Sequence, residues 1–223
     1  YIRDTYGFAP EVPRYLGLAR WDNLLQVGQA PCKKMILFMP TWRGAHYPDG
    51  EAFRDTQFYQ SCQALLNSPR LHKMLEQYGY TLVFYPHIEM QKHLTQFHTD
   101  SARVCLADST THDVQQLLLD CALLITDYSS VCWDMLYQNK PTLFYQFDLD
   151  QYNEAHGSYI DMHKDLFGDR AETSSELFDL IEKAAEHDFA LKPVYARRRS
   201  EYFQFKDQQH SRQICVAIKR RFC

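Results

Sequence analysis

The sequence predicts an α/β fold built on a doubly wound parallel sheet, and two observations point to it. Five short apolar runs alternate along the chain with longer segments whose apolar residues recur at helical spacing. Each run is almost entirely apolar rather than alternating, which is typical of strands whose sheet is covered by helices on both faces. Strands and helices that alternate in this way form parallel, Rossmann-like sheets.

The first strand is expected over residues 35–39 and the first long helix over about 57–78. Pro40 ends the strand because proline has no backbone N–H to donate to a neighbouring strand. A polar loop follows it, and Gly79 ends the helix, since glycine is common just after a helix.

The second and third strands are expected over residues 81–85 and 103–106. Pro86 ends the second strand, and a helix over about 89–97 leads from it to the third. A further helix over about 113–121 places its apolar residues along one side, as a helix packed on a sheet does.

The fourth strand, residues 122–126, runs directly into Asp127-Tyr128-Ser129-Ser130, and the fifth is expected over 141–145. Serine is a favoured helix N-cap, so this junction predicts a strand, a tight turn and a helix. The first N–H groups of a helix have no internal partner and lie at the positive end of its dipole, which suits a phosphate. The alternative is that the serines only start the helix.

Three regions follow from this pattern. Residues 1–32 contain prolines and glycines without strong periodicity, so we expect a linker with a short helix or two. Residues 33–190 are expected to form the Rossmann-like, nucleotide-binding domain, and 191–223 a basic helical segment. The chain begins without Met and without an apolar signal region, which indicates the cut edge of a longer protein.

Charge is distributed unevenly along the chain. The whole sequence carries −4, but residues 192–223 hold nine basic and two acidic residues, or +7, which leaves −11 for the rest. Such a segment is either a solvated helical face or a surface attracted to anionic lipid or a polyanionic polymer. Nucleic acid is not expected, because no recognised binding motif accompanies the basic residues.

Several classes of protein are disfavoured. No run of about 18 apolar residues is present, so no transmembrane helix is expected. Seven cysteines without a C-x-x-C pair argue against disulfides and structural zinc, and favour a reducing cytoplasm. The chain lacks the glycine-rich loops of kinases and NAD enzymes and the serine elbow of hydrolases. Scattered histidines predict neither an essential metal nor a cofactor.

Polar residues follow each predicted strand, at the edge where ligands bind in a doubly wound sheet. They are Thr41 and Arg43 after the first strand, His87 after the second, Ser109, Thr110 and Asp113 after the third, and Asp127, Ser129, Ser130 and Asp134 after the fourth. Asp148, Asp150 and Tyr152 follow the fifth strand and are assigned no role. The arginine fork suits a diphosphate, and histidine can donate to phosphate or transfer a proton.

These residues divide into three candidate roles. Arg43 and His87 are the candidate catalytic residues. The candidate phosphate ligands are Thr41, Arg43, Asp127, Ser129 and Ser130, and the candidate nucleotide ligands are Ser109, Thr110, Asp113 and Asp134. The structural alternatives are an ordinary surface arginine at Arg43, local backbone hydrogen bonding at His87, and stabilisation of helix starts at Asp113 and Asp134.

Motifs along most of the chain resemble those of the CDP-glycerol glycerophosphotransferase family, which builds teichoic-acid and capsule backbones. Residues 39–43 (MPTWR) resemble its Ala-Pro-Thr-(Phe/Trp)-Arg element, and Pro86-His87 its Pro-His element. Residues 125–134 resemble Ile-Thr-Asp-Tyr-Ser-Ser-x-x-x-Asp, the most specific motif. Further similarities are at residues 17–22 and 141–152, and at Asp207 with Ser211 and Arg212.

The resemblance implies that the chain is the C-terminal, donor-binding half of a GT-B fold, with residues 1–32 as an interdomain linker or remnant of the N-terminal half. It also implies a cytoplasmic protein that is peripheral to the inner face of a bacterial cell membrane. Its implied activity is transfer of glycerol phosphate from CDP-glycerol, or of a related polyol phosphate from its CDP-polyol, to a polymer or lipid-linked acceptor. The donor is a substrate, and the half alone is expected to be inactive. The alternatives are a nucleotide-sugar glycosyltransferase or epimerase of similar fold, and a non-catalytic module that docks on a polymer or membrane.

Overall fold

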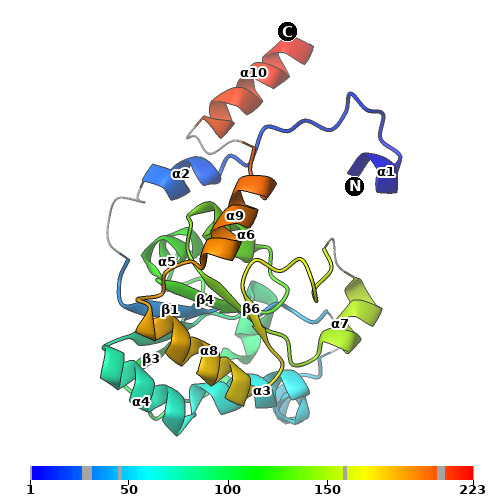
Figure 1. Cartoon of the computed structure of the whole chain (residues 1–223). Coiled ribbons are helices and arrows are strands. Elements are labelled where there is room, and N and C mark those ends of the chain that lie inside the picture. The colour runs from blue at the N-terminus through cyan, green and yellow to red at the C-terminus, as the bar shows by residue number, and fades with distance from the viewer. Residues whose placement is uncertain (1, 27–31, 45–46, 158–159, 205–208, 223) are drawn as a thin grey trace.

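Within the part of the chain that is described, six parallel strands form one sheet between two layers of helices (Figure 1). This computed structural model describes residues 2–26, 32–44, 47–157, 160–204 and 209–222. The strands are β1 (Met35–Phe38), β2 (Thr81–Phe84), β3 (Val104–Leu106), β4 (Leu123–Thr126), β5 (Thr142–Tyr145) and β6 (Asp169–Ala171). Their order is β3-β2-β1-β4-β5-β6, so the winding reverses between β1 and β4. The predicted doubly wound fold is confirmed.

Alternate side chains of each strand enter opposite cores. Ile36 and Phe38 pack with one layer of helices, whereas Leu37 packs with the other. The first layer contains α3 (Gln57–Leu66), α4 (Pro69–Tyr78) and α8 (Ser174–Glu186), and the second contains α2 (Trp21–Gln26), α5 (Val114–Asp120) and α6 (Val131–Tyr137). Burial on both faces explains why the strands are apolar throughout.

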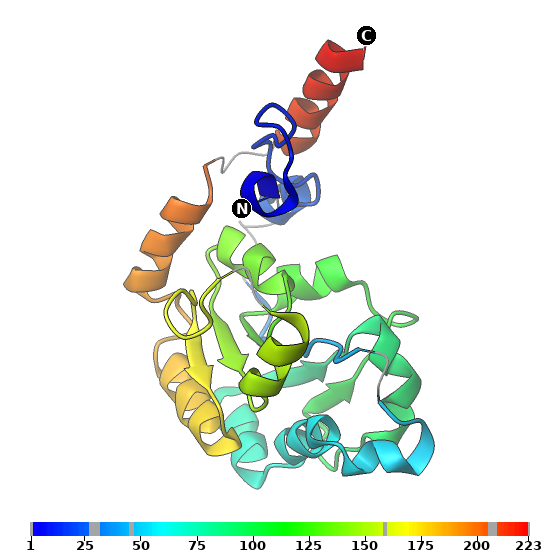
Figure 2. The same cartoon turned by 90° about the vertical axis from the view of Figure 1, so that its right-hand side faces the viewer.

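The remaining elements lie at the ends and in the loops. They are α1 (Ile2–Tyr6), the 3-10 helices η1 (Gly50–Asp55) and η2 (Ile88–Gln96), α7 (Leu149–His156), α9 (Pro193–Tyr202) and α10 (His210–Phe222). In both views α10 projects away from the body of the domain (Figures 1 and 2). Trp21 and Leu24 of α2 are buried in the second core, so part of the predicted linker packs on the domain.

The single helix predicted over 57–78 is wrong, because α3 ends at Leu66 and α4 begins at Pro69. Pro69 has no N–H for a continuous helix, and the Ser68 hydroxyl accepts a hydrogen bond from the Leu71 N–H as the N-cap of α4. Gly79 does end the second helix, in the left-handed conformation at φ 71°.

Two further differences concern short elements. The helix predicted over 89–97 is the 3-10 helix η2, which begins at Ile88 after His87. The edge strand β6 was not predicted, because Asp169-Arg170-Ala171 carries two charged residues and lacks the apolar run that marks the other strands. Its Gly168 neighbour packs against the β5 backbone, where an added methyl group would lie 2.0 Å from the Thr142 oxygen.

The break between α3 and α4 leads to a test. We expect Ser68→Ala to lower the free energy of unfolding by about 1 kcal/mol, because the buried hydroxyl caps α4. Ser175→Ala is the matched control, since this exposed serine of α8 makes no side-chain hydrogen bond within the described residues. Urea denaturation of the two variants measures the difference, and equal stability would contradict the assigned cap.

Candidate functional site

The carboxyl ends of β1, β2 and β3 surround a cleft of about 620 Å³. Residues from the loops after all three strands line it, including Met39, His87, Ser109, Thr110 and Asp113. The structure thus brings together one predicted catalytic residue and three predicted nucleotide ligands. Their common position beside the reversal point of the sheet is where doubly wound proteins bind ligands.

His87 is half-buried and oriented by two neighbours. Its ring lies parallel to that of Trp42, with centroids 6.0 Å apart and an interplanar angle of 9°. Its Nδ1 accepts a hydrogen bond from the Glu89 N–H at 3.3 Å, which assigns the proton of a neutral ring to Nε2. The imidazole is therefore set to donate through Nε2.

The loop after β3 is organised by Asp108. Its Oδ1 accepts hydrogen bonds from the N–H and hydroxyl groups of both Thr110 and Thr111, at 2.7 to 3.1 Å. These hydrogen bonds lower the pKa of Asp108 despite the opposing effect of desolvation. Asp113 caps α5 by accepting from the Gln116 N–H at 2.8 Å, so its carboxylate already has a structural partner.

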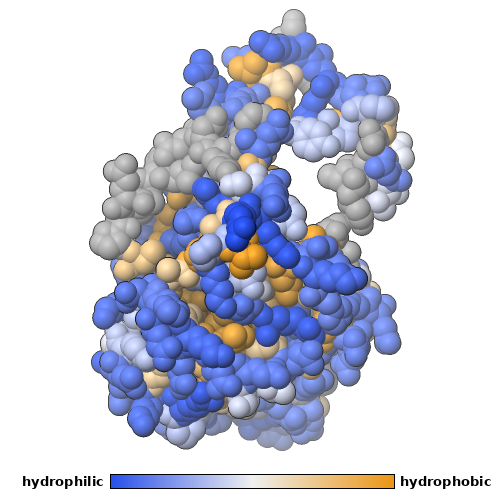
Figure 3. Space-filling view, in the orientation of Figure 1, coloured by the Kyte–Doolittle hydropathy of each residue, from blue (hydrophilic) through white to orange (hydrophobic). Residues whose placement is uncertain are grey.

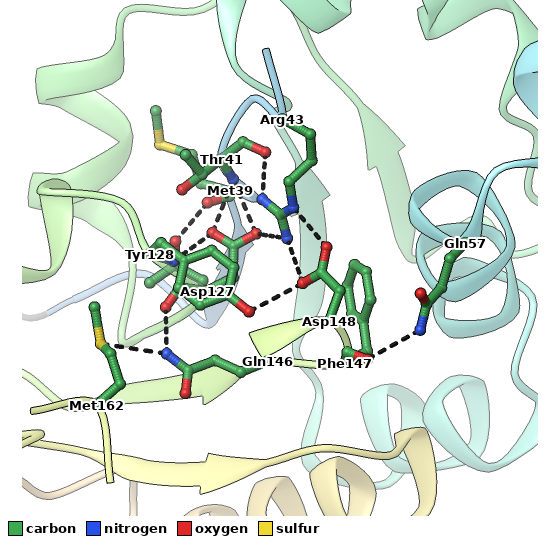
Figure 4. Close-up of polar contacts among 11 residues, drawn as sticks. Met39, Thr41, Arg43, Gln57, Asp127, Tyr128, Gln146, Phe147, Asp148 and Met162 are labelled. Atoms are coloured by element: carbon green, nitrogen blue, oxygen red, sulfur yellow. Dashed lines mark hydrogen bonds and ion pairs between the residues drawn. The ribbon is translucent and has the colours of Figure 1, made fainter. Parts of the chain in front are cut away.

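Arg43 is not the exposed cation that a direct phosphate contact would require. Its side chain is 7% exposed and is paired with Asp127 at 2.7 Å and with Asp148 at 2.7 Å (Figure 4). It also donates to the Thr41 carbonyl oxygen at 2.7 Å. Burial would lower the pKa of Arg43, but the two carboxylates raise it above its ordinary value. The structure assigns this guanidinium to holding the loop after β1.

Asp127 is equally enclosed. It is 1% exposed, and besides Arg43 it accepts hydrogen bonds from the backbone N–H groups of Thr41 and Tyr128. An ionised carboxylate has no donor for a phosphate oxygen. The direct phosphate contact predicted for Asp127 therefore gives way to a role in fixing the ends of β1 and β4.

Asp148 was not among the predicted site residues. It follows β5 and receives two hydrogen bonds from Arg43 and one from the Tyr128 hydroxyl at 3.0 Å. Burial and the charge of Asp148 raise the pKa of Tyr128. Phe58, Phe147, Tyr128 and Tyr152 surround the Arg43 guanidinium at 4.8 to 5.5 Å from their ring centroids. The sequence placed Asp148 after the fifth strand, but its ion pair with Arg43, 105 residues away, could not be predicted from spacing.

The predicted phosphate hydroxyls lie at the same edge of the sheet. Ser130 is exposed and makes no helix-capping hydrogen bond, although it precedes α6. Ser129 accepts a long hydrogen bond from the Val131 N–H at 3.5 Å. The Thr41 hydroxyl is buried without a hydrogen-bond partner. Neither serine lines the cleft beside His87 or the smaller hollow of about 210 Å³ beside Arg43 and Asp148.

Asp134 serves a different purpose from the nucleotide contact predicted for it. It is 2% exposed and accepts hydrogen bonds at 2.8 Å from the Arg20 Nε and the Trp21 indole N–H. It thus attaches Arg20 and the first residue of α2 to α6. These partners differ from both interpretations of the sequence, which were a nucleotide contact and stabilisation of the helix start.

A second set of contacts joins residues 16–22 to the start of α10, beside α6. His210 is fully buried, with Nε2 2.7 Å from the Tyr137 hydroxyl and Nδ1 3.0 Å from the Leu16 carbonyl oxygen. Asp22 accepts from the backbone N–H groups of His210 and Ser211. Gly17 permits this approach, because a Cβ there would lie 2.1 Å from the His210 Nδ1. We call these contacts, with those of Asp134, the terminal junction.

Two features of the described residues bear on the class of site. No group of three or more His, Cys, Asp or Glu side chains suited to a metal ion occurs among the residues that are described. None of the described helices combines the length and the apolar character needed to cross a bilayer.

Comparison with known proteins decides the family. The sequence model of the CDP-Glycerol:Poly(glycerophosphate) glycerophosphotransferase family matches residues 24–220. The chain belongs to this family. It is 27% identical to the minor teichoic acid biosynthesis protein GgaB of Bacillus subtilis over 97% of its own length and 24% of that protein. It is 29% identical to a teichoic acid glycerol-phosphate transferase of Staphylococcus aureus over 83% of the chain and 45% of the relative.

Solved structures agree with this family membership at the level of fold. The wall teichoic acid polymerase TagF superposes with a TM-score of 0.71 at 21% identity, over 98% of the chain and 54% of the polymerase. A UDP-N-acetylglucosamine 2-epimerase described as putative, from Listeria monocytogenes, shares the fold at a TM-score of 0.55 and 16% identity. The chain spans less than half the length of the two curated relatives above and about half of the solved polymerase.

The buried position of Arg43 leads to a second test. We expect Arg43→Leu to lower the free energy of unfolding by about 3–5 kcal/mol, because Asp127 and Asp148 would face each other without a cation.

Arg70→Leu is the matched control, because Arg70 also pairs with two carboxylates, Asp179 and Glu182, but at the exposed surface. Such pairs contribute little to stability. Chemical denaturation of both variants measures the two changes in the free energy of unfolding. An Arg43 variant as stable as the Arg70 variant would show that the buried network does not hold the strand ends.

Proposed function

We propose that this chain supplies the donor-binding half of an enzyme that transfers a polyol phosphate from a CDP-polyol to an acceptor hydroxyl. Glycerol phosphate is the group that the family description favours. The observation that carries the proposal is the family match over residues 24–220 combined with the cleft beside His87. The product would be a teichoic-acid-like polymer, as the names of the relatives suggest.

The proposed reaction is a phosphoryl transfer. An acceptor hydroxyl oxygen forms a bond to the β-phosphorus of the CDP-polyol, and the bond from that phosphorus to the bridging oxygen breaks. CMP leaves with the electron pair, and the acceptor proton passes to a base. Catalysis of such a step depends mainly on positioning and on neutralising the charge of the phosphate oxygens.

In this proposal the tasks are divided between the cleft beside His87 and the start of α6, which lies at the same edge of the sheet. His87 donates from Nε2 to a donor phosphate oxygen, since its Nδ1 is occupied by the Glu89 N–H. Ser109 and Thr110 line the same cleft and would contact the cytidine. The hydroxyls of Ser129 and Ser130 would bind phosphate at the start of α6, where backbone N–H groups are available.

Four of the predicted site residues act indirectly in this proposal. Arg43 and Asp127 hold the loop that carries Thr41, and Trp42 of that loop stacks on His87. Asp134 holds α6 from behind, and Asp113 caps α5 beside the cleft. Their substitution would disturb the position of ligand-binding groups rather than remove a ligand contact.

We expect CDP-glycerol to bind the chain and His87→Ala to weaken that binding at least about tenfold, the loss of a charge-assisted hydrogen bond. His98→Ala is the matched control, because His98 is exposed and lies outside the cleft. Calorimetry with CDP-glycerol, CDP-ribitol, CMP, UDP and GDP measures affinity and identifies the polyol. Binding of UDP or GDP as tight as that of CDP-glycerol would favour a nucleotide-sugar enzyme instead.

The proposed location is the inner face of the cell membrane, with α10 as the contact. Val216 and Ile218 of this helix are 40% and 52% exposed, and its last turn carries Lys219, Arg220 and Arg221. Each basic residue near an anionic surface contributes about 1 kcal/mol of attraction. A lipid-linked acceptor would then be delivered at the same surface.

Vesicle sedimentation tests this location. We expect the chain to bind phosphatidylglycerol vesicles and not phosphatidylcholine vesicles, and Lys219→Glu with Arg220→Glu to abolish the binding. Lys73→Glu with Lys92→Glu, an equal change of charge on the domain body, is the control. Loss of binding in both double variants would show a general charge effect and not a docking helix.

A further inference from the structure

A further cavity lies at the opposite edge of the sheet from the cleft beside His87. Its volume is about 390 Å³, and its floor is formed by the first residues of β4 and β5, Leu123 and Thr142, with Leu143. Leu180 and Ala184 of α8 form one wall, and the link to α9 closes another. The volume falls within the range of about 300–1,000 Å³ typical of small-molecule sites.

The walls are held apart by specific contacts. Asp188 and Phe189, in the link between α8 and α9, both adopt left-handed backbone conformations, at φ 51° and 53°. Such conformations cost free energy in non-glycine residues. The buried Phe189 ring anchors the link by packing edge-on against Tyr80, with centroids 4.7 Å apart. The link is thereby held in a fixed shape beside the cavity.

The start of α9 is fixed at the other side of the cavity. Asp169 of β6 accepts a hydrogen bond from the Tyr195 hydroxyl at 2.8 Å and pairs with Lys192 at 2.5 Å. These contacts join the first turn of α9 to the sheet edge and neutralise the one carboxylate that lines the cavity.

The chemistry of the lining combines an apolar interior with basic groups at the rim. Lys183 and His187, at the end of α8, are exposed and have no hydrogen bond or ion pair of their side chains among the described residues. Figure 3 shows apolar surface within a hydrophilic surround on the face that carries α8 and α9.

We propose that this cavity binds a small amphipathic anion, with an apolar body against Leu180 and Ala184 and an acidic group beside Lys183 and His187. Its position on the amino edge of the strands separates it from the carboxyl edge, where the nucleotide donor is proposed to bind. The site is therefore additional to the donor site and does not depend on its assignment.

Fluorescence titration with 1-anilinonaphthalene-8-sulfonate, an aromatic anion, tests the proposal on the whole chain. We expect one saturable site whose affinity is unchanged by saturating CDP-glycerol. Ala184→Phe, which fills the cavity, should abolish the binding, and Lys183→Glu should weaken it at least about fivefold through charge repulsion. Lys73→Glu, the same change on the exposed surface of α4, should leave it unchanged.

Uncharged N-phenyl-1-naphthylamine tests the need for an anion, and we expect it to bind at least about fivefold more weakly. The exposed position of Lys183 means that its variant should fold even if Ala184→Phe does not, and thermal melting verifies this. The proposal is overturned if folded Lys183→Glu binds the anion as wild type does, if the neutral probe binds equally well, or if CDP-glycerol displaces the anion.

Discussion

The pairing of Arg43 with Asp127 and Asp148 is the constraint on which the carboxyl edge of the sheet depends. Three segments far apart in the sequence, the loops after β1, β4 and β5, meet in this one network. Charged groups as buried as these are tolerated only when each has partners of opposite charge and filled hydrogen bonds. Two carboxylates around one guanidinium leave a net negative charge, which would repel a phosphate. The network therefore serves to hold these loops together. Trp42 lies between Thr41 and Arg43 and stacks on His87, so the network also helps to position the His87 ring.

Much of the fold could be predicted because it follows from local patterns. The apolar runs located five strands, and Gly79 marked the end of a helix. The break at Ser68-Pro69 was missed, since the helical periodicity on either side continues across it. The strand β6 was missed because an edge strand of three residues with two charges has no apolar signature. An apolar run thus identifies a strand that is buried on both faces, whereas a short edge strand of the sheet has no such run.

The site was predictable by residue type but not by environment. The sequence located His87, Ser109 and Thr110 at one edge of the sheet, and the structure places them in one cleft. It could not show that Arg43 is buried, because its partners lie 84 and 105 residues further along the chain. The same holds for Asp134, whose partners Arg20 and Trp21 precede it by more than 110 residues. Motifs that mark the family thus include residues that join distant segments, such as Arg43 and Asp134, as well as His87, which lines the cleft.

The terminal junction has a mechanical consequence for the short helix α6. Its N-terminus adjoins Ser129 and Ser130, whereas Asp134 and Tyr137, further along the same two turns, are attached to Arg20, Trp21 and His210. A hydrogen-bonded helix of this length moves as a rigid lever. A displacement at its serine end would therefore shift Arg20, Trp21 and His210, and a displacement of these residues would reach the serines by the same route.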